Sequence, residues 1–410
     1  MRFVCGVSDE TALRLLKWSE FFLMFMLIIP VAVLLYQDKG ITLGDFFLIQ
    51  GLFRIAAFAL EIPSGYVSDV FSRRKVLFIG ALIWLAGNVG LYFAYGFWQI
   101  ALCEMSFGFA AALFSGTKEA YAYDLLKRMK REKQFLQENG SIATYASTAS
   151  FTATIAGGIL YPVLGNGIIA VETVAALLAV ICTLLLPELK EVRRKIAPES
   201  SPMQDVAKIV KMSVKHPEIN LFMLFPALFG AFTIVLLWIL QPTMEDAGVA
   251  VALFGFFVGL NQFSRILFSK FAHSVYERLG IRKILFLSVA AVVTAVAAVY
   301  GALLVKNMAF VYLCCAVIAV VAAMQKMYAL VFSSLIHHRT ASSERGTVIS
   351  VSSMYATMIQ GGMLMLMKPL LDGWGIYWTM LVTLLLFATI WYPLRKILKI
   401  EGDLNKKQGD

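Results

Sequence analysis

The segment GYVSDVFSRRK, residues 65–75, joins two long apolar stretches, 44–68 and 76–95. It holds one acidic residue, Asp69, and ends in three consecutive basic residues. A helix needs about 20 predominantly apolar residues to cross a bilayer, so a short charged segment between two such stretches indicates a turn at the membrane surface. The same acid-then-basic plan returns as ERLGIRK at residues 277–283, 208 positions further along. The repeat predicts a chain made of two similar halves.

The overall composition fits lipid as the surrounding solvent. Hydrophobic residues make up 60% of the 410 residues and charged residues 15%, and the mean hydropathy is +0.76. Soluble domains carry about 45–50% apolar and about 25% charged residues, so a soluble fold would lack the polar surface to cover this core. The five cysteines are too few for a secreted disulfide scaffold.

The apolar stretches are long enough for helices and too long for barrel strands. None alternates strictly between apolar and polar residues, as a barrel strand would. The sequence predicts twelve membrane-spanning helices, at 15–36, 44–68, 76–95, 99–124, 141–163, 167–186, 219–242, 249–272, 283–305, 308–335, 347–370 and 375–394.

Basic residues collect on one side of these spans. Of the 36 Lys and Arg residues, 29 lie in the two tails and in alternate connections, and only three lie in the opposite set of connections. The positive-inside rule therefore predicts that both termini are cytoplasmic and that the protein is a multi-pass protein of the inner membrane. This placement also accounts for the net charge of +10 without a nucleic-acid partner.

The longest hydrophilic stretch divides the chain in the middle. We expect an N-terminal six-helix bundle over 1–187, a cytoplasmic linker over 188–218 and a C-terminal six-helix bundle with a short tail over 219–410. Apolar residues within 203–215 fall near one face of a helix, so this part of the linker is predicted to be amphipathic and to lie along the membrane surface.

Residues 65–75 resemble the loop signature of the major facilitator superfamily, Gly-x-x-x-Asp-Arg-x-Gly-Arg-Arg/Lys. The segment departs from it at Val70, where Arg is usual, and at Ser72, where Gly is usual. Supporting stretches that are similar to bacterial members are EIPSG (61–65), SGTKEA (115–120), QP (241–242) and RGTVIS (345–350). The resemblance implies an all-α membrane protein in which two pseudo-symmetric six-helix bundles surround a central cavity.

The resemblance also assigns the signature a role. It places Asp69 near the start of the eleventh span, where unsatisfied helix N–H groups favour a carboxylate by about 0.3–1 kcal/mol. Arg73 and Arg74 would pair with Asp124 and hold this conformational latch. The alternatives are that Asp69 is a solvated loop residue and that the two arginines only set the topology.

Charged residues within the spans need a partner or a cavity, because a charge at mid-bilayer costs at least about 2.5–3.5 kcal/mol. Arg54 and Glu61 are seven apart on one helix face and are predicted to form inter-helix polar contacts, either structural or substrate-related. Glu104, Glu172 and Arg265 lie within two turns of helix ends, so we expect them to snorkel to the interface.

By the resemblance, spans 1, 4, 7 and 10 line the cavity. This implies a substrate site formed by Lys118, Trp238, Gln241, Gln325, Lys326 and Tyr328. Lys118 and Lys326 are 208 apart, the offset of the repeated loop, and two cations in one cavity suit an anionic or zwitterionic solute. The alternative is internal pairing, for example of Lys118 with Glu20.

Proton coupling requires a desolvated carboxylate. Glu119 is the first candidate and Glu20 the second, although either could be an ion-pair partner only. The sequence holds no phosphate-binding loop, no metal-ligand spacing and no hydrolase motif, so we expect neither an enzyme nor a cofactor. The predicted function is secondary active transport by a monomer, with proton-coupled export of an amphipathic or anionic compound; proton-coupled uptake and lipid flipping are the alternatives.

Overall fold

The structure is a computed structural model that describes residues 7–70, 72–189, 217–339 and 345–399. For residues 61–70, 217, 266, 269–270, 272–273, 334, 337–339 and 345–350 it describes the backbone only. Every regular element in the described ranges is a helix. The chain divides into two compact units: unit 1 comprises Met1–Ile41 and Leu52–Met203, and unit 2 comprises Thr42–Gly51 and Gln204–Asp410.

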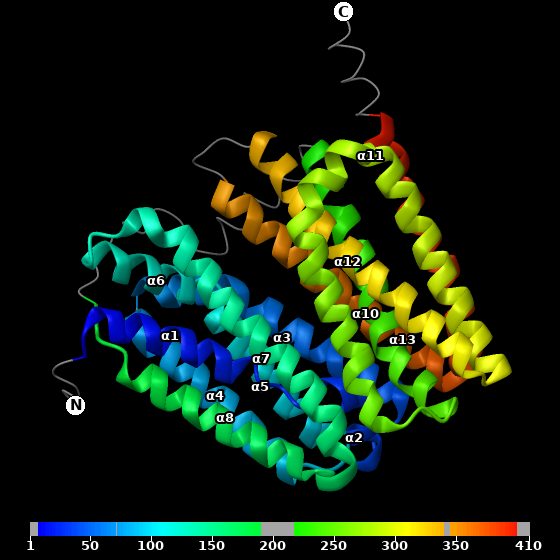
Figure 1. The fold of residues 1–410 in the computed structure, drawn as a ribbon, viewed down its shortest axis with the longest axis horizontal. Coiled ribbons are helices and arrows are strands. Elements are labelled where there is room, and N and C mark those ends of the chain that lie inside the picture. Colours follow the sequence, from blue (N-terminus) through cyan, green and yellow to red (C-terminus); the bar gives the residue numbers. More distant parts are fainter. Residues whose placement is uncertain (1–6, 71, 190–216, 340–344, 400–410) are drawn as a thin grey trace, which may run out of the picture. The chain divides into compact units, whose positions relative to one another are not determined.

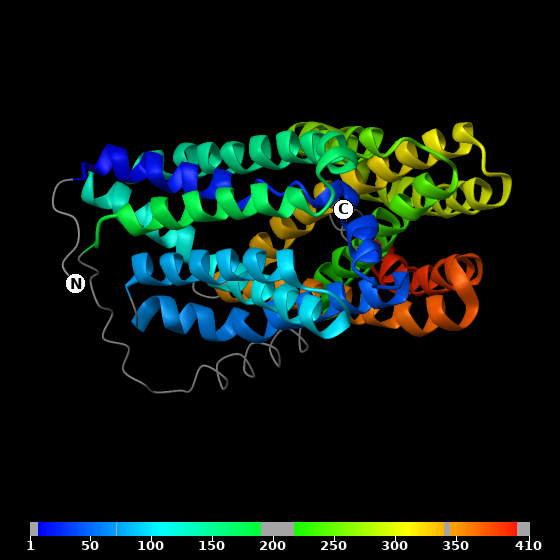
Figure 2. The same cartoon turned by 90° about the horizontal axis from the view of Figure 1, so that it is seen from below.

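Unit 1 is a bundle of helices from the first half of the chain (Figures 1 and 2). Within it α8 packs against α1 and α4, α4 also packs against α5, and α7 packs against α1. The helices are α1 (Asp9–Leu23), the 3-10 helix η1 (Ile29–Val31), α2 (Ala32–Asp38), α3 (Leu43–Val70), α4 (Arg73–Phe93), α5 (Phe97–Phe114), α6 (Thr117–Arg128), the 3-10 helix η2 (Glu132–Gln134), α7 (Phe135–Leu164) and α8 (Gly167–Leu185).

Two spans of unit 1 that the sequence predicts as continuous helices are broken. The first is interrupted after α1, and Pro30 stands at the start of η1, where its ring and missing N–H prevent the helix from running through. The fourth ends at Phe114 and restarts at Thr117, because Gly116 takes a φ of 73° that glycine alone adopts at little cost. Each interruption places non-helical backbone inside an apolar stretch.

Unit 2 contains α10 (Pro217–Asp246), the 3-10 helix η3 (Val251–Leu253), α11 (Phe254–Val305), α12 (Met308–Arg339), α13 (Arg345–Phe387) and the 3-10 helix η4 (Ala388–Ile390). In α11 and α13 the chain turns at Gly280 and Gly375, whose φ angles are 67° and 72°. Each of these two helices therefore covers two of the predicted spans. α11 packs against α12, and α10 packs against both α12 and α13.

The first turns of α3 also belong to unit 2. Lys368 of α13 bonds to Asp45 at 2.6 Å and to Asp372 at 2.8 Å, and the ring of Phe46 lies 5.1 Å from that of Trp238. The predicted division at 188–218 assigns residues 42–51 to the N-terminal bundle, whereas in the structure they group with unit 2. Most of that predicted linker, residues 190–216, lies outside the described residues.

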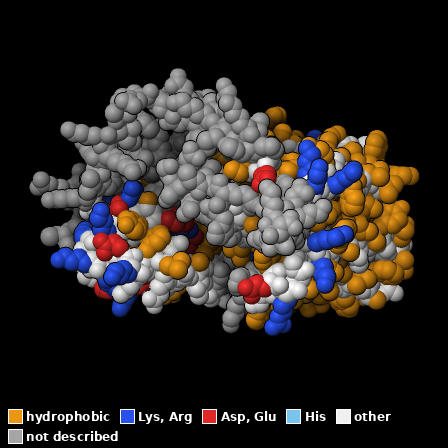
Figure 3. Space-filling view, turned by 90° about the horizontal axis from the view of Figure 1, so that it is seen from above, with side chains coloured by type: hydrophobic (Ala, Val, Ile, Leu, Met, Phe, Trp, Pro, Cys, Tyr) orange, Lys and Arg blue, Asp and Glu red, His pale blue; other side chains and the backbone are white. Residues whose placement is uncertain are grey.

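The helices are suited to a bilayer. Among the described residues, nine helices are long and apolar enough to cross a membrane. Many large apolar side chains face outward, including Trp98 at 76% exposure and Val163 at 81%. Exposing so many apolar side chains to water is unfavourable, whereas contact with lipid is favourable. Figure 3 shows a broad hydrophobic flank beside a face that carries Lys, Arg, Asp and Glu side chains. The protein is a multi-pass membrane protein; the count of twelve spans remains a prediction.

Candidate functional site

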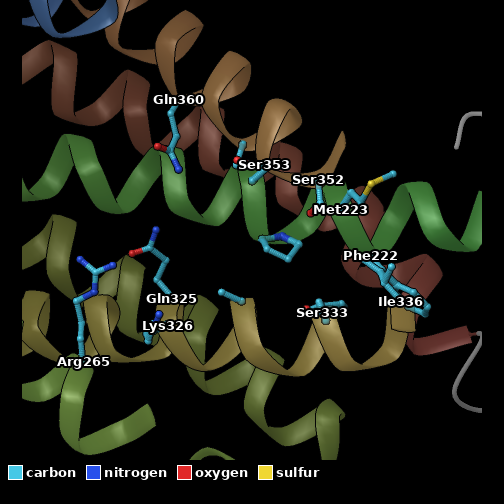
Figure 4. Close-up of a pocket in the computed structure, with 15 residues that line it drawn as sticks. Phe222, Met223, Arg265, Gln325, Lys326, Ser333, Ile336, Ser352, Ser353 and Gln360 are labelled. Carbon is cyan, nitrogen blue, oxygen red and sulfur yellow. The ribbon is translucent and has the colours of Figure 1, made fainter. Parts of the chain in front are cut away.

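Unit 2 contains a cavity of about 320 Å³ between α10, α11, α12 and α13. This volume lies at the small end of the range of about 300–1,000 Å³ that small-molecule sites occupy. Figure 4 shows Arg265, Gln325 and Lys326 at one end of the cavity, with Gln360 reaching toward them from the opposite wall. Phe222 and Ile336 lie at the other end.

The polar end of the cavity carries two cations. Arg265 comes from α11 and Lys326 from α12, and they lie close enough for their charges to repel each other. In the described part of the chain neither forms an ion pair, and no acidic residue lines the cavity. Two adjacent cations without a counter-charge repel each other, so the arrangement favours an anion between them. Arg265, which the sequence predicts to snorkel, lines this cavity, and its snorkelling remains a prediction.

Neutral hydrogen-bonding groups complete this end. Gln325 and Gln360 converge on Gly230 of α10: a Cβ atom added there would lie 3.0 Å and 2.8 Å from their respective side-chain nitrogens. The absence of a side chain at residue 230 therefore leaves room for both amides. Hydroxyl groups of Ser333, Ser352 and Ser353 line the same cavity. Amides and hydroxyls can each donate to the oxygens of an anion.

Apolar side chains form much of the remaining wall, beside Ser333 and Ser352 (Figure 4). Phe222 and Phe332 pack with ring centroids 5.7 Å apart, and Met223, Pro226 and Ile336 continue this surface. A cavity with a cationic end and an apolar wall matches a ligand that has one charged and one apolar part.

Three residues predicted to bind substrate do not line this cavity. Tyr328 is 1% exposed, and its hydroxyl group bonds to Ser288 and to the carbonyl of Ile284 at 3.0 Å, so it belongs to the core. Gln241 is also 1% exposed. The Trp238 indole N–H is buried and has no acceptor in the described residues. Of the six predicted residues, Gln325 and Lys326 are the ones that the cavity brings together.

In unit 1 the structure shows the internal pairing of Lys118. Its ammonium group lies 2.7 Å from Oε1 of Glu20, and the two side chains are 20% and 9% exposed. The break at Gly116 sets Lys118 and Glu119 in the first turn of α6, from which Lys118 reaches Glu20 of α1. One oxygen of Glu119, Oε2, is buried and has no hydrogen-bond partner among the described residues.

The predicted pair of Arg73 and Asp124 is present as an ion pair, and Arg73 also donates to the carbonyl of Ala120 at 3.1 Å. Arg74 does not join it: its guanidinium donates to the carbonyl of Leu184 at 2.6 Å. The side chains of Asp69 and Glu61 lie outside the described residues, so the predicted latch at Asp69 and the Arg54–Glu61 contact remain predictions. The Arg54 guanidinium lies 5.6 Å from the ring of Phe53.

The two outer glutamates do not snorkel. Glu172 is 6% exposed and accepts a hydrogen bond of 2.6 Å from the backbone N–H of Ile28. Glu104 accepts a hydrogen bond from the hydroxyl group of Tyr36, which is itself 1% exposed. The distance from a helix end along the sequence is therefore a poor guide here, because neighbouring helices cover these positions.

The chain belongs to the Major Facilitator Superfamily, whose family profile matches residues 20–364. An uncharacterized transporter of Buchnera aphidicola subsp. Acyrthosiphon pisum is 24% identical over 42% of this chain and 43% of its own length. An uncharacterized MFS-type transporter of Methanocaldococcus jannaschii is 29% identical over 35% of each chain. Both matches span less than half of the relative.

Solved structures of transporters share the fold along nearly the whole chain. The nucleoside transporter NupG has a TM-score of 0.76 at 15% identity, covering 96% of this chain and 99% of that one. A bacterial homolog of the human lysosomal transporter Spinster, inward-facing and unoccupied, has a TM-score of 0.71 at 15% identity and covers 96% and 99%. A D-xylose–proton symporter has a TM-score of 0.68 at 14% identity and covers 93% and 97%. At these identities the likeness shows the fold alone.

Proposed function

We propose that this transporter exports an amphipathic organic anion and that protons drive the movement. The observation that carries the proposal is the pair of unneutralised cations, Arg265 and Lys326, at one end of the unit 2 cavity. Arg265 offers a planar fork of donors for a carboxylate or phosphoryl group, and Lys326 adds a point charge. The apolar wall around Phe222 and Phe332 would hold the rest of the solute.

Lys118 is not part of the proposed anion site. Its charge is balanced by Glu20 at 2.7 Å, so the pair would attract an anion far less than an isolated lysine does. The same contact leaves Glu119 as the stronger of the two candidates for proton coupling. The buried Oε2 of Glu119, which has no hydrogen-bond partner among the described residues, is the observation behind this assignment.

A counterflow assay in proteoliposomes tests the substrate class. Matched organic anions, cations and neutral compounds are compared, with and without an imposed pH gradient. The proposal predicts exchange of anions, and it predicts accumulation on the side from which protons flow. Exchange of cations alone would overturn the anion site, accumulation on the proton-receiving side would indicate symport, and an unaltered distribution would remove proton coupling.

A cavity-filling variant links this activity to the cavity. Gly230→Ala adds a methyl group 2.8 Å from the Gln360 nitrogen, and the flexible end of that side chain can move aside, so the fold should persist. We expect weaker anion transport with an unchanged melting temperature. Gly362→Ala on α13 is the matched control, because no atom lies within 4 Å of its added Cβ. Equal activity of the two variants would place the solute elsewhere.

A further inference from the structure

The break in the first span leaves backbone groups that need partners. α1 ends at Leu23 and η1 begins at Ile29; the N–H of Met24 still donates to the carbonyl of Glu20 at 3.0 Å, and the α-helical bonding pattern stops there. The N–H groups of Phe25 and Met26 bond to nearby carbonyls, at 3.4 Å and 3.0 Å. No backbone acceptor within hydrogen-bond distance serves the N–H groups of Leu27 and Ile28 in the described chain. Within an apolar region such groups require an acceptor.

Glu172 of α8 supplies that acceptor. Its Oε1 lies 2.6 Å from the Ile28 nitrogen, and the Leu27 backbone contributes a further hydrogen bond. α7 also packs closely against the break. At Gly157 of α7 there is no room for a side chain, because an added Cβ would lie 1.9 Å from the Leu27 carbonyl oxygen. One turn earlier on α7, Thr154 is 0% exposed and its hydroxyl group is unpartnered among the described residues.

The charges around Glu172 do not neutralise it. No lysine or arginine in the described ranges pairs with it, and Glu104 of α5 and Tyr36 of α2 are the titratable groups that interact with it electrostatically. Titratable groups of the neighbouring elements have other partners. On α1, Lys17 pairs with Glu138 and Glu20 pairs with Lys118, and on α7, Tyr161 bonds to Asp38. The ammonium group of Lys39, which follows α2, donates to the carbonyls of Tyr92 and Ala94.

We propose that Glu172 is a proton-binding site whose protonation loosens the break between α1 and η1. In the ionised state the carboxylate accepts charge-assisted hydrogen bonds from two amides and fixes the non-helical backbone. A proton from water adds to one carboxyl oxygen, the charge is lost, and the bonds to Leu27 and Ile28 weaken. The non-helical backbone between α1 and η1 can then change its conformation. This site is separate from the anion cavity and does not depend on which solute is carried.

Hydrogen–deuterium exchange measures the predicted effect directly. The peptide that covers residues 24–31 is followed in purified protein over a series of pH values, with rates corrected for intrinsic exchange. In the wild type its protection should fall as the pH is lowered. In Glu172→Gln the amides should exchange faster at alkaline pH, roughly tenfold to a hundredfold, and protection should no longer titrate. The matched control, Glu138→Gln, removes a carboxylate that bonds to side chains, and should leave the peptide unchanged.

Two outcomes would overturn the proposal. One is wild-type protection that is constant with pH; the other is a Glu172→Gln protein that is as protected as the wild type. If Glu172→Gln does not fold, Glu172→Asp keeps the charge on a shorter side chain and should show a reduced but still titrating protection. The readout requires no substrate, so failure of the anion proposal leaves this test intact.

Discussion

Breaking the pair between Lys118 and Glu20 tests how unit 1 is held together. The change is Lys118→Gln, which leaves the Glu20 carboxylate at 9% exposure without its cation. Removing one member of a buried pair costs about 3–5 kcal/mol. Because the Lys118 side chain keeps 20% exposure, water can compensate in part, and we expect the lower end, about 3 kcal/mol.

This loss converts to a measurable change in thermal stability. For a cooperative unit of about 150–250 residues, 1 kcal/mol corresponds to about 2–4 °C, so the melting temperature should fall by about 6–12 °C. The double variant Lys118→Gln with Glu20→Gln replaces the ion pair by two neutral amides of similar size. It should recover most of the loss, because no uncompensated charge is left buried.

The assay is thermal unfolding of the detergent-solubilised protein, followed by intrinsic fluorescence, for the wild type, both single variants and the double variant. A fall of less than about 2 °C in Lys118→Gln would mean that the pair is too well solvated to matter. A double variant no more stable than the single one would show that the charge of Glu20 is not the cause. Either result would refute the reasoning and reopen a substrate role for Lys118.

Three further predictions concern other parts of the fold. Gly157→Ala should destabilise the protein and lower its yield, because the new Cβ would lie 1.9 Å from a backbone oxygen. Gly140→Ala on the same helix meets no atom within 4 Å and should be neutral or stabilising by about 0.5–1 kcal/mol. A Gly157→Ala protein as stable as the wild type would contradict the close packing of α7 against the break between α1 and η1. A double-mutant cycle between Lys368 and Asp45, whose side chains are 31% and 22% exposed, should give a coupling energy of about 0.2–1 kcal/mol. A coupling energy above about 2 kcal/mol would show that the pair is more shielded from solvent than these exposures indicate. A reporter fused after the C-terminus should be active only in the cytoplasm, and periplasmic activity would reverse the predicted topology.

Much of the architecture can be predicted from the sequence because the bilayer imposes it. The apolar stretches, the asymmetry of the basic residues and the repeated charged turn all arise from the need to keep charge out of lipid. What periodicity does not show is where a span is broken. Pro30 and Gly116 are visible in the sequence, but a proline or glycine inside a span can also bend a helix without interrupting it.

The site is harder to predict, because the packing of the surrounding helices decides which polar side chains line the cavity. Lys326 and Gln325 could be selected, since polar residues within a span call for a cavity. The distance of Arg265 from the helix end predicts a place at the interface, whereas the residue lines the cavity together with residues of α10, α12 and α13. Gln360 gave no signal beyond being an amide in an apolar stretch. Lys118 is the predicted cavity cation of the other half. Its partner, Glu20, is brought to it by the packing of α1 on α6, which the sequence does not show.

The central claim, that the cations of the unit 2 cavity select an anion, is tested most directly by one ratio. Counterflow of a matched anion and cation is measured side by side in proteoliposomes that hold Lys326→Gln, with Lys283→Gln, an exposed residue of α11, as the control. Loss of one hydrogen-bonded charge should reduce the anion-to-cation ratio by roughly tenfold or more relative to the wild type, while the control leaves it unchanged. An equal loss for both charge classes, with the protein folded, would contradict the claim and leave Lys326 a structural residue.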